Sequence, residues 1–309
     1  MEITDKIIQH AQAGDLETLA MLDSKGFLIG AHESADQFAE RLKTLRHNIR
    51  EMDRELEENG RFLFGNYSVT AEDRIPAGIF TACSSMTEHL YSFRIDWVPG
   101  FFVTPSFSWL FGGCAFYSFP DFFTFFIIRQ CFARKKRWLI YDRDELLAHE
   151  LCHVARIGLQ SNIFEENFAY KTASSRFRRK VGGMFRGPFD AFLLLGSTLI
   201  LLLSQVTKTF FLPGLDVAYF WGVVGLAVLS LGTRHLSACL KFRKCLKKLA
   251  GVSPDFFLAV AFRCTDTEIH QLASGKVGDI RSWINSRTTD SLRWQVIQHR
   301  FISEDESVR

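Results

Sequence analysis

The stretch DELLAHELCHVAR (residues 144–156) places two histidines, His149 and His153, four positions apart, with Glu150 directly after the first. In a helix, residues four apart lie on one face, so both imidazoles would project together with Glu150 beside them. Hydrolytic zinc sites have three protein ligands and a water, and this turn provides two of the three. The neighbouring carboxylate can take a proton from that water. The pattern predicts a zinc site with Glu150 as general base; two histidines in the core of an amphipathic helix are the alternative.

The helix that carries this motif is expected to be about fifteen residues long. Asp142, followed three residues later by Glu145, resembles a capping box, in which the first side chain accepts hydrogen bonds from first-turn N–H groups. Gly158 is the expected end of the helix. Cys152, inside the motif, is expected to be a small packing residue, with regulation through its thiol as the alternative.

The segment after Gly158 is the expected source of the third metal ligand. LQSNIFEENFAYKTASSRFRRK (residues 159–180) predicts a second helix that starts near Asn162. Glu165 would then be the third helical residue, where a carboxylate can reach back and cap the helix start. This leaves Glu166 as the third ligand, with Glu165 or a residue distant in the sequence as the alternative.

These residues resemble the gluzincin-type zinc metallopeptidases. That group carries H-E-x-x-H on one helix and a ligating Glu on a following helix, often within N-E-x-F-A or E-x-x-A-D, and here E-N-F-A-Y starts at Glu166. The resemblance covers roughly residues 120–180. It implies Zn²⁺ ligands at His149, His153 and Glu166, with Glu150 as general base. Some members of the group are membrane-embedded and have zinc sites that face the cytosol.

Two residues near the motif invite further roles. Tyr170 stands where the E-x-x-A-D pattern has an Asp that holds a ligand histidine, so the partner that orients the imidazole comes from elsewhere or is Tyr170 itself. Arg156 and Tyr170 are also candidate hydrogen-bond donors to a developing oxyanion. A salt bridge for Arg156 and simple packing for the Tyr170 ring are the alternatives.

Two apolar runs predict a transmembrane hairpin. PFDAFLLLGSTLILLLSQV (residues 188–206) carries one charge, and as a helix it spans roughly 28 Å, about the hydrocarbon core of a bilayer. FFLPGLDVAYFWGVVGLAVLSLG (residues 210–232) is similar, with Pro213 and Gly214 expected in the connecting turn. A hairpin buried in a large soluble core is the alternative.

The charges beside these runs predict an orientation. Basic residues crowd RFRRKVGGMFR (residues 176–186) before the first run and RHLSACLKFRKCLKK (residues 234–248) after the second, whereas Lys208 is the one basic residue between the two. The positive-inside rule therefore predicts both termini and the zinc site on the cytoplasmic side. The basic segments are expected to contact anionic lipid headgroups, and no motif of a nucleic-acid-binding fold accompanies them, so nucleic acid is not an expected partner.

The remaining segments predict helices at both ends and strands between them. Residues 1–60 predict a short helix pair and a long helix that ends at Gly60, with apolar residues at helical spacing. Residues 61–141 predict strands, including a hairpin within FTFFIIRQCFARKKRWLIY (residues 123–141) that turns near residues 133–136. Buried strands are expected for residues 101–132, with contact at the membrane interface as the alternative. Residues 234–309 predict a small helical module, with Thr265 or Asp266 capping one helix and Asp290 another.

Composition excludes several classes of protein. With 47% hydrophobic residues in 309, the chain is too apolar to be disordered, and its net charge of +3 points to no acidic partner. Its seven cysteines are scattered and contain no C-x-x-C pair, which indicates neither a disulfide framework nor a thiolate zinc cluster. Residues 1–20 contain acids and no apolar run, so no cleaved signal peptide is expected.

Together these patterns predict an α+β chain in four parts. The parts are an N-terminal helical segment (residues 1–60), a zincin-like catalytic domain (61–187), a transmembrane helical hairpin (188–233) and a cytoplasmic C-terminal helical module (234–309). The predicted function is a membrane-anchored zinc metallopeptidase that cleaves peptides or proteins, membrane-associated ones included. The alternative is a non-catalytic membrane scaffold with a structural zinc or a degenerate site.

Overall fold

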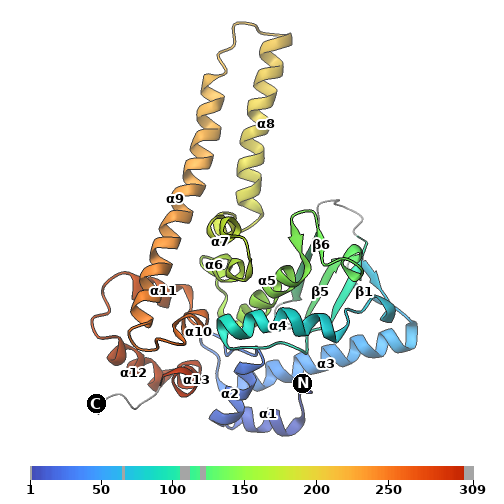
Figure 1. Cartoon of the computed structure of the whole chain (residues 1–309), viewed down its shortest axis with the longest axis vertical. Coiled ribbons are helices and arrows are strands. Elements are labelled where there is room, and N and C mark those ends of the chain that lie inside the picture. The colour runs from blue at the N-terminus through green and yellow to red at the C-terminus, as the bar shows by residue number, and fades with distance from the viewer. Residues whose placement is uncertain (1, 65–66, 105–111, 119–122, 303–309) are drawn as a thin grey trace.

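The computed structural model describes residues 2–64, 67–104, 112–118 and 123–302. The chain is mainly helical, with small sheets. Two long helices, α8 (Pro188–Phe210) and α9 (Ala218–Leu249), pack side by side and project from a globular body (Figure 1). The body contains residues from both sides of this hairpin.

The N-terminal helices form as predicted. They are α1 (Asp5–Gln12), α2 (Leu16–Ser24) and α3 (Ala35–Asn59). Ser34 and Gln37 close a capping box at the start of α3, and Gly60 ends it in the left-handed region with φ 67°. The apolar residues of α3 that recur at helical spacing are buried, which confirms the predicted stripe: Phe38, Leu42, Leu45, Met52 and Leu56.

The middle of the chain contains a helix that the sequence analysis misses. Residues 61–141 were expected to form strands, but α4 (Ala77–Tyr91) is a helix of 15 residues. Its buried side chains Phe80, Cys83, Thr87 and Tyr91 recur every three or four positions, which is the helical period. That spacing is present in the sequence, but the aromatic runs that follow it favour a strand prediction for the whole segment.

The strands form one three-stranded sheet and two small hairpins. In the sheet, β5 (Phe123–Arg129) lies between β3 (Gly100–Val103), which is parallel to it, and β4 (Gly113–Ser118), which is antiparallel. The two small pairs are β1 (Phe62–Phe64) with β2 (Tyr67–Val69), and β6 (Arg137–Trp138) with β7 (Tyr141–Asp142).

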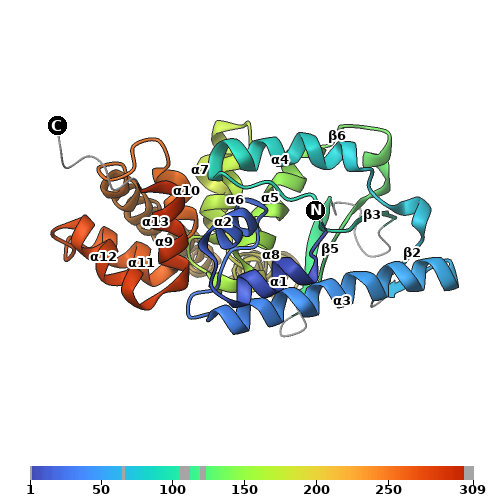
Figure 2. The ribbon, with the colours of Figure 1, turned by 90° about the horizontal axis from the view of Figure 1, so that it is seen from below.

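Both faces of this sheet are covered, which explains why residues 125–128 of β5 are all apolar. Phe126 and Ile128 belong to the core that contains α4, whereas Phe125 and Ile127 belong to the cluster that contains residues of α3. Seen from below, α3 and α4 lie on opposite sides of the sheet (Figure 2). Alternate side chains of one strand therefore enter two different cores.

The predicted hairpin within residues 123–141 is wrong. β5 pairs with β3 and β4, and a short 3₁₀ turn (Gln130–Ala133) leads away from it. β6 pairs only with β7, across a turn in which Leu139 has φ 51°. A strand buried on both faces needs apolar neighbours, and the basic residues 134–137 cannot supply them. Part of the stretch considered for membrane contact, residues 105–111 and 119–122, lies outside the described residues.

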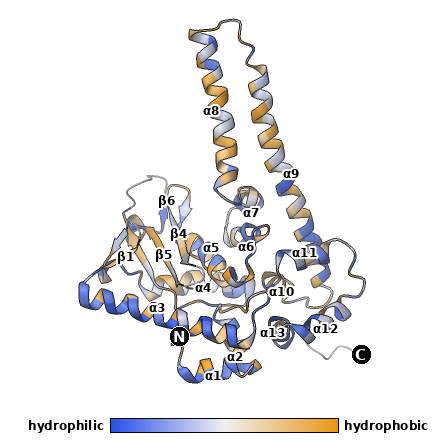
Figure 3. Ribbon diagram, turned by 180° about the vertical axis from the view of Figure 1, so that it is seen from behind, coloured by the Kyte–Doolittle hydropathy of each residue, from blue (hydrophilic) through white to orange (hydrophobic). Residues whose placement is uncertain are grey.

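The α8–α9 hairpin is long and apolar enough to cross a membrane. In the most apolar window of each helix only 17% of the residues are buried. Figure 3 shows hydrophobic residues along α8 and the outer part of α9. Pro213 and Gly214 lie in the connection, as predicted. A hairpin in a soluble core would be mostly buried, and this one is not. α9 also continues without a break past the predicted boundary at residue 233.

The C-terminal helices pack on the rest of the body. Trp294 and Ile297 belong to the same core as Phe126 and Leu147. Thr265, one of the two predicted caps, caps α11 and closes a capping box with Glu268. The last helix is capped by Ser291 and not by Asp290, which ends the helix before it. The helices are α10 (Phe257–Phe262), α11 (Asp266–Ala273), α12 (Ile280–Asp290) and α13 (Leu292–Phe301).

Candidate metal centre

Helix α5 (Arg143–Arg156) carries the H-E-x-x-H motif. Asp142 caps it and accepts hydrogen bonds from the backbone N–H groups of Asp144 (3.0 Å) and Glu145 (3.3 Å). The capping box is not completed, because the Glu145 carboxylate instead accepts from Ser174 N (3.1 Å) and from Arg178 (2.9 Å). The predicted cap residue is therefore confirmed, and its predicted partner has a different contact.

The end of α5 differs from the prediction. The helix ends at Arg156 and a 3₁₀ turn follows (Ile157–Leu159), so Gly158 lies within that turn. A Cβ atom at Gly158 would lie 3.2 Å from the Cα atom of Gly30. The absence of a side chain at this position therefore permits close packing of two backbone segments.

The short helix α6 (Glu165–Ala169) starts three residues later than predicted, and Glu165 does not cap it. The segment just before the helix is held by Asp266, far along the chain. Its carboxylate accepts hydrogen bonds from three successive N–H groups and from the hydroxyl of Ser161 (2.5 Å). The N–H donors are Asn162 (2.8 Å), Ile163 (2.7 Å) and Phe164 (3.3 Å).

His149, His153 and Glu166 come together in the structure. The Nε2 atoms of the two histidines are 3.2 Å apart. Each of them lies 3.5 Å from a carboxylate oxygen of Glu166. The three ligand atoms lie within 4.8 Å of one another, so they could hold a metal ion.

Glu165 holds His153 from the other side of the imidazole ring. Its Oε1 atom lies 3.3 Å from His153 Nδ1, and its Oε2 atom accepts from Arg156 Nε at 2.7 Å. Arg156 is buried and also donates to the backbone carbonyl of Phe262. For Arg156 the salt bridge, and not a role as oxyanion donor, is therefore what the structure shows. Glu165 is the imidazole partner that the sequence did not identify.

Glu150 lies between the ligands and the sheet. Its Oε2 atom accepts a hydrogen bond from the backbone N–H of Ala115 in β4, at 2.9 Å. In the three-stranded sheet, as the structure describes it, β4 is an outer strand. Since the N–H of Ala115 points to Glu150, it points away from the paired strand β5. Burial raises the pKa of Glu150.

Tyr170 contributes a ring to the same site. Its ring meets that of His149 edge to face, with 4.7 Å between centroids. A Cβ atom at Gly182 would lie 2.3 Å from the Tyr170 ring, so a glycine is needed there for this close approach. Burial raises the pKa of the Tyr170 hydroxyl, which keeps it a hydrogen-bond donor over a wide pH range.

The site concentrates negative charge. Burial alone would lower the pKa of His153, but its hydrogen bond to the Glu165 carboxylate and the charges of Glu150, Glu165 and Glu166 raise it to about 9. Burial, together with Glu150 and Glu165, raises the pKa of Glu166 to about 7. Such a cluster favours a cation in its centre, either a proton or a metal ion.

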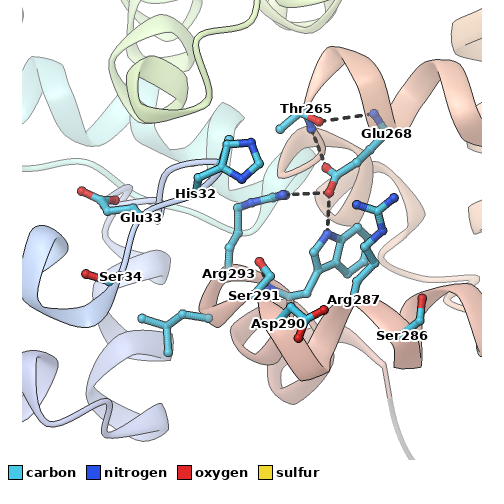
Figure 4. Close-up of a pocket in the computed structure, with 13 residues that line it drawn as sticks. His32, Glu33, Ser34, Thr265, Glu268, Ser286, Arg287, Asp290, Ser291 and Arg293 are labelled. Atoms are coloured by element: carbon cyan, nitrogen blue, oxygen red, sulfur yellow. Dashed lines mark hydrogen bonds and ion pairs between the residues drawn. The ribbon is translucent and has the colours of Figure 1, made fainter.

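One pocket lies away from these residues. It has a volume of about 780 Å³ and lies between residues 31–34 and the helices α11 to α13 (Figure 4). Its buried carboxylate is already engaged, because Glu268 accepts hydrogen bonds from Arg293 (2.8 Å) and Trp294 (2.7 Å). A smaller pocket of about 410 Å³ is lined by His153, Glu165 and Arg156 among others. We therefore base the functional argument on the metal-ligating residues and not on pocket size.

The four residues that the sequence singled out, His149, Glu150, His153 and Glu166, lie in one site. The supporting residues Ala115 and Asp266 were missed, because each reaches the site through a contact distant in sequence. The chemistry that this site could perform is inferred from its own side chains. No protein family model, no curated protein and no solved structure matches this chain.

Proposed function

We propose that this chain is a membrane-anchored, zinc-dependent hydrolase of the gluzincin type that cleaves peptide bonds on the cytoplasmic side. The observation that supports it most is the convergence of His149, His153 and Glu166 with Glu150 beside them. A zincin-like arrangement of sheet, motif helix and ligand helix would carry these residues. Nitrogen and oxygen ligands of this kind suit Zn²⁺.

The spacing of the ligand atoms fits zinc. Atoms bound to Zn²⁺ at about 2.0–2.2 Å in a tetrahedron lie about 3.3–3.6 Å apart. His149 Nε2 lies 3.2 Å from His153 Nε2 and 3.5 Å from Glu166 Oε2, and His153 Nε2 lies 3.5 Å from the other oxygen, Oε1, so these separations are close to those values and involve both carboxylate oxygens. The cluster contains three ligands among the described residues, which leaves a fourth position for water. A catalytic zinc needs this open position, whereas a structural zinc has four protein ligands.

The surrounding residues have distinct tasks in the proposed reaction. Zinc, when bound, supplies Lewis-acid activation of water and of the substrate carbonyl. Glu150 takes the proton of the attacking water and passes it to the leaving amine, while the Ala115 N–H holds its other oxygen in place. Glu165 holds His153 through Nδ1, so that Nε2 faces the other ligands.

Strand β4 supports a peptide as the substrate. It is an outer strand of its sheet as described, and Ala115 places it directly beside Glu150. An extended peptide that pairs with such an edge brings its backbone carbonyl groups past the catalytic residues. A small substrate without an extended backbone would not use this edge.

The membrane part of the proposal rests on the hairpin. Both helices are long and apolar enough to span a bilayer, and exposed apolar side chains cover them. By the positive-inside rule, the basic segments beside the two spans favour a cytoplasmic location of the body. A non-catalytic membrane scaffold with a structural zinc is the second candidate, and the three-ligand cluster argues against it.

The test is metal content together with turnover. The purified protein should hold about one zinc per chain. His149→Ala and His153→Ala should each lose it. Glu150→Gln should keep the zinc and lose about 100-fold or more of the hydrolysis of a mixed peptide library. Undiminished zinc in both histidine variants, or full hydrolysis by Glu150→Gln, would falsify the proposal. Zinc without any hydrolysis by the wild type would favour the scaffold.

A further inference from the structure

A basic and aromatic surface lies where the hairpin meets the body. The helix α7 (Arg176–Val181) and the turn after it, residues 176–187, form what we call the ledge. In Figure 1 α7 lies at the lower end of α8 and above α6, while α9 continues past it toward α11. The ledge contains no acidic residue. Its exposed cations are Arg176, Arg179 and Lys180.

Large aromatic side chains are exposed beside these cations. Phe177 is 71% exposed, Phe185 37% and Phe189, at the start of α8, 75%. In water this exposure is unfavourable, because each ring could remove much of its apolar surface by burial. Aromatic rings among Lys and Arg at the end of an apolar span are typical of segments that lie in the interface of a bilayer.

Further along α9, beyond the span, two more cations add positive charge. Lys241 and Arg243 are exposed there. The acid closest in sequence to the ledge is Asp190, which is buried and already paired with Arg234 and with the backbone N–H of Arg186. The cations of the ledge are therefore not neutralised by it, and the surface matches anionic headgroups in charge.

The ledge also packs directly on the candidate metal centre. A Cβ atom at Gly183 would lie 3.5 Å from the Cβ atom of Glu166, and one at Gly182 would overlap the ring of Tyr170. Arg178 donates to Glu145 of the motif helix at 2.9 Å. A shift of the ledge would therefore move the segment that carries Glu166.

We propose that the ledge lies on the bilayer surface and binds anionic phospholipid headgroups, and that this contact holds the Glu166 segment in position. The inference rests on the membrane insertion proposed above, and it adds a lipid-dependent regulation of the proposed zinc site. The partner is a bilayer that contains an anionic phospholipid. Each cation near such a surface strengthens binding about fivefold, so three together contribute about 100-fold.

The experiment uses the full chain in lipid nanodiscs. Hydrogen exchange of residues 176–187 is compared between discs of phosphatidylcholine alone and discs that also contain phosphatidylglycerol. We expect slower exchange of the ledge, and slower loss of zinc to a chelator, in the anionic discs. Inorganic phosphate added to the neutral discs should not reproduce either effect.

The variant R176Q/R179Q/K180Q should abolish the difference between the two lipids. The matched control K6Q/K276Q/R281Q removes three exposed cations from α1 and the C-terminal region and should leave the difference unchanged. Equal exchange of the ledge in both lipids, or an equal effect of the control, overturns the inference. Zinc content and hydrolysis of the wild type in detergent are measured separately. These measurements test the proposed function, whereas the lipid comparison tests whether the ledge binds anionic lipid.

Discussion

Two adjacent carboxylates, Glu165 and Glu166, have opposite environments. Burial opposes the charge of Glu165, but Arg156 and His153 hold its pKa below the ordinary value. Burial raises the pKa of Glu166 to about 7, and its neighbours include two further carboxylates. Glu165 is therefore a charged partner for an imidazole, whereas Glu166 is a carboxylate that gains most from a bound cation.

This difference predicts unequal effects of two conservative substitutions. Glu166→Gln should lose most of the zinc affinity, since a neutral amide is a poor substitute for a carboxylate ligand. Glu165→Gln should weaken zinc binding by about 10–100-fold, the usual effect of losing a residue that orients a ligand histidine. The measurement is a competition titration with a zinc chelator, with the exposed Glu57→Gln as control. Greater loss in Glu165→Gln than in Glu166→Gln would exchange the two roles.

At the scale of single elements, α6 is too short to be stable alone. A helix of five residues has little internal hydrogen bonding, so its position depends on outside contacts. Asp266 supplies them by binding the three N–H groups that precede it. A residue from beyond the hairpin thus determines where the ligand segment starts.

Asp266→Ala should therefore lower zinc affinity, and its effect on zinc affinity should exceed that of a control substitution that lowers stability by a similar amount. The loss of stability should be about 0.5–2 kcal/mol, as for other lost caps, because Thr265 still caps α11. Asp279→Ala is a matched control, since Asp279 caps α12 in a similar way and has no contact with the metal centre among the described residues. Thermal unfolding and zinc titration of both variants check this. An equal loss of zinc affinity in the two would show that Asp266 acts only through stability.

The contact between α11 and α13 predicts a dependence of stability on pH. Burial opposes the charge of Glu268, but Arg293 and the hydrogen bond from Trp294 hold its pKa below 4.5. A folded-state pKa below the unfolded value stabilises the fold fully above about pH 4.5, and this stabilisation disappears as the pH falls through the folded-state pKa. The difference in melting temperature between wild type and Glu268→Gln should thus be largest at neutral pH and shrink in acid. A difference that stays constant with pH would contradict this.

At the scale of the whole molecule, the chain leaves the globular body at α8 and returns to the same body through α9. Phe126 and Leu147, which precede it, share a core with Val260 and Trp294, which follow it. Asp23 in α2 also pairs with the buried Arg263, at 2.7 Å. Because one core cannot lie on both sides of a membrane, the proposed insertion of the hairpin requires its two flanks to be on the same side.

Reporter fusions test this arrangement. Reporters inserted after Lys180 and after Ala250 should both be cytoplasmic, and one in the α8–α9 connection, residues 211–217, should be on the opposite side. The basic flanks predict which side of the membrane the first two reporters are on. The shared core predicts that both are on the same side. Opposite locations for the first two reporters would exclude the hairpin, and all three in the cytoplasm would exclude membrane insertion.

Local patterns in the sequence are sufficient for several features of this protein. The apolar stripe of α3 and its end at Gly60, the shared helical face of His149 and His153, and the two apolar spans depend on residues within a few turns of one another. Helical periodicity, capping and hydropathy act over such distances, so the sequence predicts them directly.

Contacts between distant segments decide the rest. Glu165 looked like a cap residue because only local partners were in view, whereas Arg156 and His153 bind it in the folded chain. The N–H groups before α6 are satisfied by Asp266, about a hundred positions away, and β5 pairs with β3 and β4 instead of the basic segment beside it. Buried hydrogen-bonding groups take whichever partner the fold brings near, and no local pattern specifies that partner.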